Sequence, residues 1–415
     1  MNDLRERLFT RGAVATGLVV LGVYAIALWF ERYGIRSATH GSDVAAYETR
    51  AASIAHGSIP YRNLFFEYPP GALAPIMAAE PFSNYATAFK VVMAVIGAGA
   101  LGFAAACLPN RGYAGSWPLL AIAAAPVAVG SVFVNRFDLW PALLMAAALA
   151  FLVRGRPTVG FALLAAGAAT KIFPAFAVPA AAVWVWRTQG RDALRRALLA
   201  FAVTGLLILL PFAILGAGGL RYSFTIQLTR HLQTESLGGA LLLVGHRLGL
   251  YSPRIATGNP GSLDLFGRLP DVVGVLSIVL VLLLVAWGAL LLAQGRVDSD
   301  RMVAGTVAAV CVYVAFGKVL SPQYVVWLVP LVPLVRRQRV VAAGLLLAIL
   351  VLTQVEFDLH YGQIRSTGPV VWILLARDLL LVCLAVLVVS MSRATQTGSG
   401  VAKSIHGSGS AGSRS

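Results

Sequence analysis

Charged residues are scarce in this chain, since Asp, Glu, Lys and Arg make up 12% of its 415 residues. Soluble globular domains carry about 25% of these residues, which excludes an ordinary cytosolic enzyme. Hydrophobic residues make up 58% and the mean hydropathy is +0.79. Disorder over most of the length is excluded as well, because disordered chains have low hydrophobicity. The composition predicts an all-α polytopic membrane protein.

Cysteine and acidic residues are also few. Cys107, Cys311 and Cys383 lie in apolar runs without the spacing of a metal site, and we expect buried thiols. Acidic residues number 17 against 33 basic ones, which gives a net charge of +16. Such an excess suggests nucleic acid in a soluble protein. Here the basic residues lie between apolar runs, so we interpret them as topology signals and expect no nucleic-acid partner.

Motifs of common soluble enzymes are missing. Zinc-site spacings, an EF-hand loop and a P-loop are absent, and the low-complexity glycine–serine tail offers no credible GxSxG nucleophile elbow. Residues 97–102 match GxGxxG, but they lie inside an apolar run with no strand before them. Small residues that pack helices together explain this stretch better.

Eleven apolar runs are candidates for crossing a bilayer, which takes about 20 residues each. They lie near residues 13–30, 86–107, 117–134, 139–153, 158–186, 197–215, 271–293, 302–317, 322–335, 340–355 and 369–391. The fifth run is too long for one span and contains Lys171, Pro174 and Pro179. We expect two short helices there with a turn near Lys171, and therefore about 12 transmembrane helices (11–12).

The distribution of charge orients these spans. Basic residues are concentrated in the short loops of one side, whereas most acidic residues fall in the long loops of the other. The positive-inside rule then places both termini in the cytoplasm of a multi-pass cell-membrane protein. We predict one membrane domain over residues 1–390 and a disordered cytoplasmic tail over 391–415, which is rich in Gly and Ser.

The first long outer loop, about residues 31–85, is the richest in polar groups. Residues 42–56 are predicted to form a short amphipathic helix with Ser42 as its N-cap. Asp43 and Tyr47 are four residues apart and share a face of that helix. A carboxylate held there at the membrane edge fits a lipid head group, although interaction with the helix dipole is the alternative.

Further polar groups fall at the outer ends of other spans. These are Asn135, Arg136 and Asp138 before one span, Lys171 in its predicted turn, and Lys318 with Gln323. A cation at such a place can neutralise a phosphate. A tight polar turn at 135–138 and a snorkelling Lys171 are the alternatives.

Taken together, these segments resemble glycosyltransferase family 87, the polyprenyl-phosphate-mannose-dependent α-mannosyltransferases of the GT-C superfamily. The matching segments are residues 43–47, 57–61, 68–70, 135–139 and 167–174, with a weaker match at 236–239. Each motif is short, so their order and topology carry the resemblance, which spans most of residues 13–390.

The resemblance implies a GT-C fold, an extracytoplasmic site and an acidic residue in the first outer loop, which Asp43 matches. The implied reaction moves a hexose, with mannose the first candidate, from a polyprenyl-phosphate donor to a hydroxyl of a glycolipid or glycan. Asp43 is expected to be the general base of an inverting transfer, with Glu48 and Glu67 as other candidates. We expect no metal ion or other cofactor, since a phosphate leaving group needs less help than an alkoxide.

The remaining candidates follow from this reaction. Cations for the donor phosphate are Lys171, Arg62, Arg136 and Lys318. Substrate-binding candidates are Tyr47, Tyr61, Glu67, Tyr68, Asn135, Asp138, Gln323 and His360. The aromatic side chains among them are also typical of a membrane-interface belt.

A transporter or lipid flippase is the rival interpretation. It predicts charged groups at the middle of the membrane, often in repeated halves. Only Lys90 and the Arg377–Asp378 pair qualify, and no internal repeat is present. The concentration of acidic residues in the outer loops favours the transferase.

Overall fold

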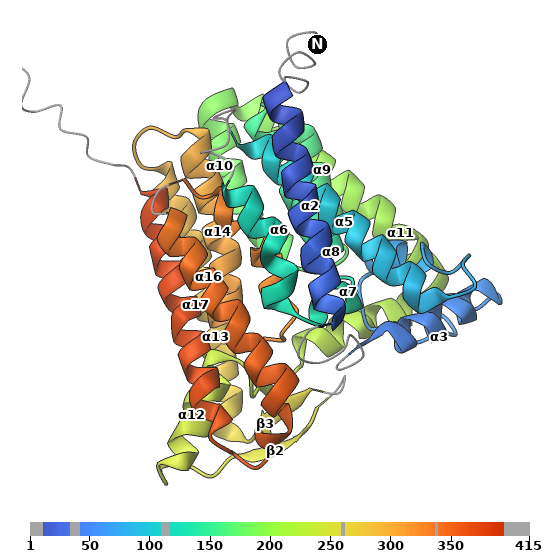
Figure 1. Cartoon of the computed structure of the whole chain (residues 1–415), viewed down its shortest axis with the longest axis vertical. Helices are drawn as coiled ribbons and strands as arrows, with labels where there is room; N and C mark the ends of the chain where they lie inside the picture. The colour runs from blue at the N-terminus through green and yellow to red at the C-terminus, as the bar shows by residue number, and fades with distance from the viewer. Residues whose placement is uncertain (1–10, 34–41, 109–116, 259–261, 337–338, 394–415) are drawn as a thin grey trace, which may run out of the picture.

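The computed structural model describes residues 11–33, 42–108, 117–258, 262–336 and 339–393. Long helices run side by side and form a bundle, capped at one end by shorter elements (Figure 1). The long and medium helices are α2 (Arg11–Tyr33), α5 (Tyr85–Cys107), α6 (Trp117–Val129), α8 (Leu139–Val153), α9 (Pro157–Ala168), α10 (Val178–Gln189), α11 (Arg191–Leu228), α13 (Arg268–Ala293), α14 (Ser299–Phe316), α16 (Arg339–Gln354) and α17 (Val370–Ser392). The others are α3 (Val44–Ala55), α4 (Leu73–Met77), α7 (Val132–Asn135), α12 (Leu237–Arg247) and α15 (Tyr324–Leu328).

The bundle has the apolar exterior of a membrane protein. Within the described ranges, six helices are long and apolar enough to cross a bilayer, namely α5, α11, α13, α14, α16 and α17. Large apolar side chains such as Leu207 and Leu283 are exposed on α11 and α13, as expected for contact with lipid. These features confirm a polytopic helical membrane protein, while the number of crossings stays a prediction.

The three cysteines were expected to be buried. Cys107 and Cys311 are buried, but Cys383 is exposed on α17, so the expectation was wrong for that cysteine.

The predicted break near Lys171 is present. Helix α9 ends at Ala168, a 3₁₀ turn covers Phe173–Ala177, and α10 begins at Val178. Pro174 and Pro179 occupy first-turn positions of the two following elements, where the missing N–H of proline costs nothing. The long apolar run therefore folds as two helices, and Lys171 lies in the turn between them.

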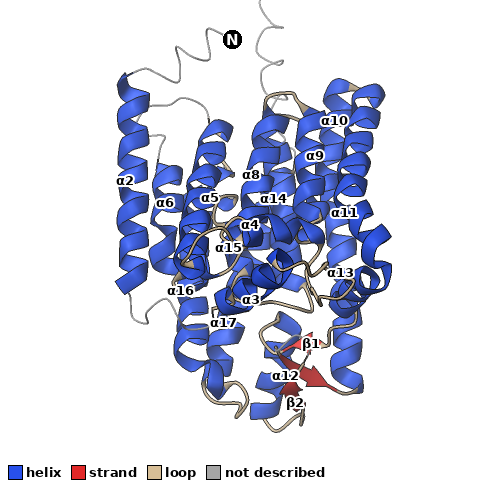
Figure 2. Ribbon diagram, turned by 90° about the vertical axis from the view of Figure 1, so that its right-hand side faces the viewer, coloured by secondary structure: helices blue, strands red, loops and turns tan. Residues whose placement is uncertain are grey.

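The two ends of the bundle differ. The start of α2 and the end of α17 lie at one end, and α3, α12 and the strands lie at the other (Figures 1 and 2). The placement of both termini on one side of the membrane stays a prediction, since residues 1–10 and 394–415 lie outside the described ranges. Which compartment each end faces stays a prediction, and the tail from residue 394 lies outside the described residues.

Helix α3 forms the predicted amphipathic element. It begins one residue later than expected, with Asp43 as N-cap, while Ser42 Oγ accepts a hydrogen bond from Val44 N at 3.2 Å. Val44, Tyr47 and Ala51 are its buried residues, spaced as one face of a helix. The helix runs across the end of the bundle rather than along it (Figure 1).

Helix α11 has a kink at Gly216 (φ −154°, ψ 49°), and a second helical segment continues from there to Leu228. The kink lies where we expected the span to end, near residue 215, but helix follows it instead of the expected outer loop. A Cβ atom at Gly219 would lie 2.0 Å from the carbonyl oxygen of Tyr61. The glycines therefore allow close packing against the first outer loop rather than marking the start of a loop.

A small antiparallel sheet departs from the all-α prediction. Its strands are β1 (Leu232–Gln233), β2 (Arg254–Thr257) and β3 (Leu263–Phe266), in the order β1-β3-β2. Leu265 pairs with Leu232 on one side and Ile255 on the other, and packs in a core shared with α12 and α17. Strands of two to four residues are too short to show an alternating pattern in the sequence.

Replacing Gly219 by Ala is expected to destabilise the protein, because the new Cβ would collide with the backbone of Tyr61. Overpacking of this kind costs about 1–3 kcal/mol. The matched control is Gly218→Ala in the same helix, where nothing lies within 4 Å of the added atom and Ala favours the helix. Thermal unfolding in detergent should show a lower midpoint for the first variant only. Equal midpoints would contradict this packing.

Candidate functional site

Asp43 lies at the start of α3 and is held by one of its two carboxylate oxygens. Oδ2 accepts from Arg136 Nη1 at 2.5 Å and from the hydroxyl of Tyr47 at 3.3 Å. Tyr47 reaches it because residues four apart share a helix face. Within the described ranges Oδ1 forms no such hydrogen bond, and 29% of the side chain is exposed. The carboxylate is thus positioned by protein contacts and still offers one oxygen to a substrate.

A second acid lies two residues beyond Arg136 and is deeply buried. Asp138 Oδ1 accepts from Lys171 Nζ at 2.6 Å and from Trp327 Nε1 at 2.7 Å. The Lys171 ammonium also lies 4.9 Å from the Phe137 ring centroid and 5.6 Å from that of Tyr324, within cation–π range. Burial lowers the pKa of Lys171, and the Asp138 carboxylate opposes this shift. The pair joins α8, the α9–α10 turn and α15.

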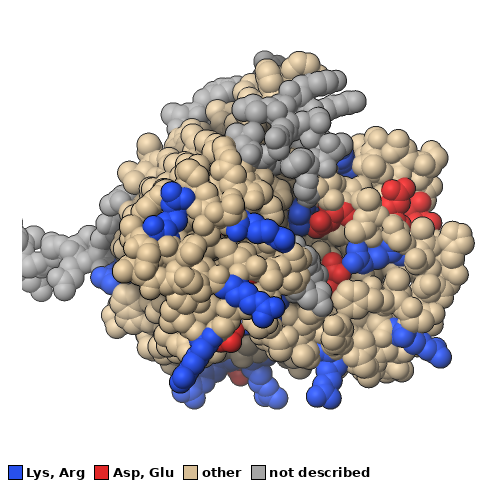
Figure 3. Space-filling model, turned by 90° about the horizontal axis from the view of Figure 1, so that it is seen from below, with Lys and Arg blue, Asp and Glu red and all other residues tan. Residues whose placement is uncertain are grey.

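These side chains form one electrostatic unit, which we call the Asp43 cluster. Its members are Asp43, Tyr47, Tyr68, Arg136, Asp138 and Lys171. Two acids balance two bases, and each acid has a basic partner within 2.6 Å. Burial raises the pKa of Tyr47 and of Tyr68 well above the ordinary value, so both phenols remain neutral hydrogen-bond donors. Figure 3 views the molecule from the end that carries α3, α12 and the strands. Most of the acidic side chains visible there lie in one region beside Lys and Arg.

Several other predicted residues pack near the cluster in supporting positions. The Tyr61 hydroxyl donates to the carbonyl oxygen of Tyr68 at 2.6 Å. Glu67 accepts from Arg50 Nη2 at 2.6 Å, so its carboxylate is already neutralised. Glu48 is exposed on α3, and Asn135 is fully buried just before Arg136. Of the three acids proposed as a base, Asp43 alone joins the cluster by a direct contact.

Four predicted residues are not brought to the cluster by any contact within the described ranges. Arg62 is exposed. Lys318 Nζ donates to the carbonyl oxygen of Leu228 at 2.8 Å, and His360 Nδ1 lies 3.0 Å from the carbonyl oxygen of Val355. Gln323 is buried beside Tyr324. Their proposed roles in binding the donor or the acceptor therefore stay predictions.

A buried network around Arg377 was missed by sequence reasoning. Arg377 pairs with Glu356 at 3.1 Å and Asp378 at 3.0 Å, and donates to the carbonyl oxygen of Glu235. The Glu235 carboxylate accepts from Gln233 Nε2 at 2.8 Å and is electrostatically coupled to Arg136. The sequence showed Arg377–Asp378 inside a span and Glu235 in an outer loop, but gave no sign that they meet.

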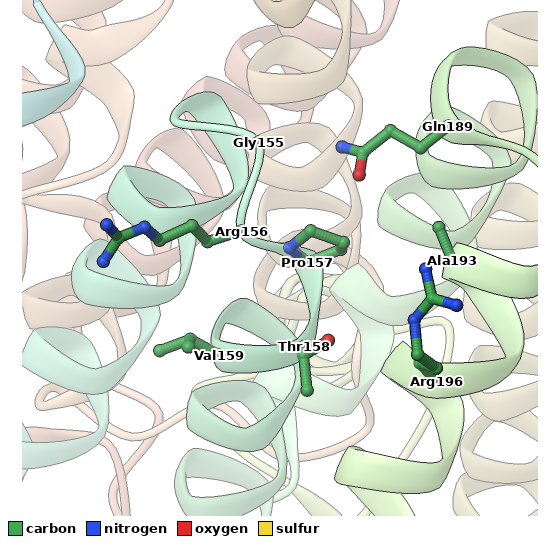
Figure 4. A pocket seen from close by; sticks show the side chains of 8 residues that line it. All are labelled: Gly155, Arg156, Pro157, Thr158, Val159, Gln189, Ala193 and Arg196. Carbon is green, nitrogen blue, oxygen red and sulfur yellow. The ribbon is translucent and has the colours of Figure 1, made fainter.

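A polar pocket of about 320 Å³ lies at the opposite end of the bundle from α3. It is lined by Gly155, Arg156, Pro157, Thr158, Val159, Gln189, Ala193 and Arg196. Figure 4 shows Arg156 directed away from Arg196, so the two guanidinium groups do not converge. We assign no role to this pocket.

The described residues contain no group of three or more His, Cys, Asp or Glu that could hold a metal ion.

Replacing Lys171 by Met should destabilise the protein by about 3–5 kcal/mol, because it leaves the buried Asp138 carboxylate without its cation. The double variant Asp138→Asn with Lys171→Met should lose less than the sum of the two single losses. Thermal unfolding of the three variants measures this coupling. Strictly additive effects would show that the pair contributes no interaction energy.

The buried Glu235 predicts a pH dependence of stability. Burial raises its pKa to about 7, against the lowering effect of Arg377. The folded chain therefore holds a proton that the unfolded chain releases at lower pH, so stability falls as pH rises from about 4 to 8. Thermal midpoints between pH 5 and 8 should decline less steeply in Glu235→Gln than in the wild type. The same slope in both proteins would rule out this carboxyl as the source.

Known proteins were compared with the chain as a whole. A model of glycosyltransferase family 87 matches residues 65–322, whereas no curated protein matches the sequence. The crystal structure of ArnT from Cupriavidus metallidurans in the apo state is similar at 18% identity, with a TM-score of 0.46 over 91% of this chain and 78% of that chain. Because the family match covers more than half of the sequence, the chain belongs to glycosyltransferase family 87.

Proposed function

We propose that this membrane glycosyltransferase moves a hexose, with mannose the first candidate, from a polyprenyl-phosphate donor to a hydroxyl of a glycolipid or glycan. The observation that carries the proposal is the geometry of Asp43, whose Oδ2 is fixed by Arg136 and Tyr47 while Oδ1 is left open. Family membership supports glycosyl transfer as the reaction class and disfavours the transporter interpretation. The identity of the sugar and of its lipid carrier is the part proposed here.

In this mechanism Asp43 is the general base. Its free oxygen accepts the proton of the acceptor hydroxyl, which requires an approach of about 2.6–3.2 Å. The hydroxyl oxygen attacks the anomeric carbon, the bond from that carbon to the phosphate oxygen breaks, and the phosphate leaves with the bonding electrons. Attack from the side opposite the phosphate inverts the configuration. Arg136 keeps the carboxylate oriented during this step.

Cations near Asp43 stabilise the charge that develops on the phosphate. Arg136 and Lys171 are the first candidates, since both belong to the Asp43 cluster, and Lys318 and Arg62 are the second. Fixed charges in a site shielded from water stabilise a transition state strongly. A phosphate leaving group is already stable as an anion, so the proposal includes no metal ion.

The architecture suits a donor that stays in the bilayer. The exposed leucines of α11 and α13 face lipid, while the Asp43 cluster lies at the end of the bundle where α3 crosses it (Figure 1). A polyprenyl chain can remain among lipids while its phosphate reaches this end. We propose that this is the extracytoplasmic end, with both termini in the cytoplasm, as the basic loops of the opposite end favour.

The test compares lipid-extractable and cell-envelope glycans of a deletion strain complemented with wild type, Asp43→Asn, Asp43→Glu or Glu48→Gln. Asp43→Asn should lower transfer by about 10²–10⁴-fold, because the amide cannot accept the proton. Glu48→Gln is the matched control, since it removes an exposed carboxylate from the same helix. Membrane levels of all four proteins are measured in parallel.

The sugar that is missing in the deletion strain and restored by the wild type identifies the product. Full restoration by an equally abundant Asp43→Asn protein would exclude Asp43 as the base. Loss in Glu48→Gln with retention in Asp43→Asn would move the role to Glu48. An unchanged glycan profile in the deletion strain would overturn the proposed transfer itself.

A further inference from the structure

A second cleft, of about 350 Å³, opens beside the end of α11 and against the small sheet. It is lined by Tyr222, Thr225, Ile226, Thr229, Arg230, His231, Thr257, Gly258, Asp264 and Phe266. None of these residues belongs to the Asp43 cluster or to the predicted site. The volume falls at the low end of the range for small-molecule pockets, which is enough for one sugar ring.

The cleft wall carries an acceptor and a donor that the protein leaves unused. Asp264 is 1% exposed, and its Oδ1 accepts from Ser262 Oγ at 2.8 Å, whereas Oδ2 has no partner in the described chain. Arg230 Nη2 donates to Ser262 Oγ at 3.1 Å, while the buried Nε of Arg230 is likewise unpartnered. Leaving buried polar atoms unpaired costs about 1–3 kcal/mol each, and a bound ligand can supply the missing partners.

The backbone of Gly258 packs directly against the Asp264 carboxylate. A Cβ atom at that position would lie 1.8 Å from Asp264 Oδ2, so any other residue would displace the carboxylate. Asp264 and Gly258 both line the cleft, so the atoms that lie directly over Oδ2 at this point are backbone rather than a side chain.

Aromatic rings and hydroxyls complete the cleft. Tyr222 is 49% exposed, and the His231 ring lies 4.3 Å from that of Phe266. Such rings offer apolar faces to the C–H side of a sugar. The threonine hydroxyls of Thr225 and Thr229 donate to the helix backbone, so they face a ligand as acceptors only. The lining thus combines hydrogen-bonding groups with ring faces, which matches a neutral polyol.

A phosphate group fits this cleft less well. The Asp264 carboxylate and the acceptor hydroxyls would repel its oxygens, and Arg230 is the one Lys or Arg among the residues that line the cleft. Hydroxyl groups of a sugar can donate to Asp264 and accept from Arg230 at the same time. The chemistry of the lining therefore selects a carbohydrate rather than the head group of the donor lipid.

We propose that this cleft is the acceptor subsite, which binds a neutral hexose residue of the acceptor through adjacent hydroxyls on Asp264 and Arg230. This role rests on the proposed glycosyl transfer. The cleft is connected to the Asp43 cluster along α11. Ile226 lines the cleft, and the next residue, Gln227, donates from Nε2 to the carbonyl oxygen of Glu67 at 3.2 Å, directly before Tyr68 of the cluster.

The experiment measures binding without turnover. Saturation-transfer NMR on the full chain in lipid nanodiscs, free of sugar-based detergent, uses methyl α-mannopyranoside, methyl α-glucopyranoside and methyl α-galactopyranoside as probes. At least one should bind in the millimolar range. Asp264→Asn should weaken it about tenfold, as expected for loss of a charged hydrogen-bond acceptor. Tyr222→Ala, at an exposed position, should weaken it severalfold and guards against misfolding of the first variant.

Two controls fix the location. Asp300→Asn removes an exposed carboxylate paired with Arg336 at the other end of the bundle, and should bind like the wild type. Asp43→Asn should also bind within about threefold of the wild type, since Asp43 does not line the cleft. Loss of binding in Asp43→Asn with retention in Asp264→Asn would place the sugar at the reaction centre and overturn the proposal.

The remaining outcomes separate the ligand classes. Failure of all three hexosides to bind would overturn the proposal. Binding of inorganic phosphate that is lost in Arg230→Gln would identify an anion site and would also overturn it. If the hexoside binds through Asp264 while deletion of the protein changes no glycan, the cleft binds sugar but the acceptor role falls together with the proposed transfer.

Discussion

The ion pair between Asp138 and Lys171 is the interaction on which the arrangement of the site depends. It lies 2.6 Å across, is almost fully buried, and shares its acid with the indole of Trp327. Because an unpaired charge is costly in such surroundings, the pair fixes the α9–α10 turn against the start of α8 and against α15. Arg136, two residues before Asp138, is thereby directed toward Asp43. Asp43 and Arg136 are thus positioned by a contact in which neither residue takes part.

The same rule governs the other charges that the bundle buries. Arg377 lies within α17, yet it contacts Glu356, Asp378 and the backbone of Glu235. These contacts hold the outer segment before α12 against the membrane helices, and the small sheet follows from that segment. Charged residues inside a span could indicate a transport pathway. Here Arg377 and Asp378 instead link α17 to the segment before α12. The positive charge of Arg136 also lowers the pKa of Glu235, against the effect of burial.

The Asp43 cluster and the second cleft carry different kinds of polar groups at this end of the molecule. The Asp43 cluster has balanced charges and neutral phenols, which suits the proton transfer and phosphate departure of the proposed reaction. The cleft beside α11 has unused acceptors and rings, which suits a sugar. Helix α11 connects the two, since its glycines pack on Tyr61 of the first outer loop and its last turns line the cleft.

The sequence by itself determined the membrane class, most span positions, the break at Lys171 and the amphipathic helix that begins with Asp43, because apolar length, proline and helical spacing are local signals. It also identified Asp43, Tyr47, Tyr68, Arg136, Asp138 and Lys171 as candidates. Only the tertiary structure decided that these six meet, that Glu67 is taken by Arg50, and that Lys318 and Arg62 lie apart from the cluster. The short strands, the Arg377 network and the Asp264 cleft depend on contacts between residues distant in the chain. Pairing and burial of that kind leave no periodic pattern in the sequence.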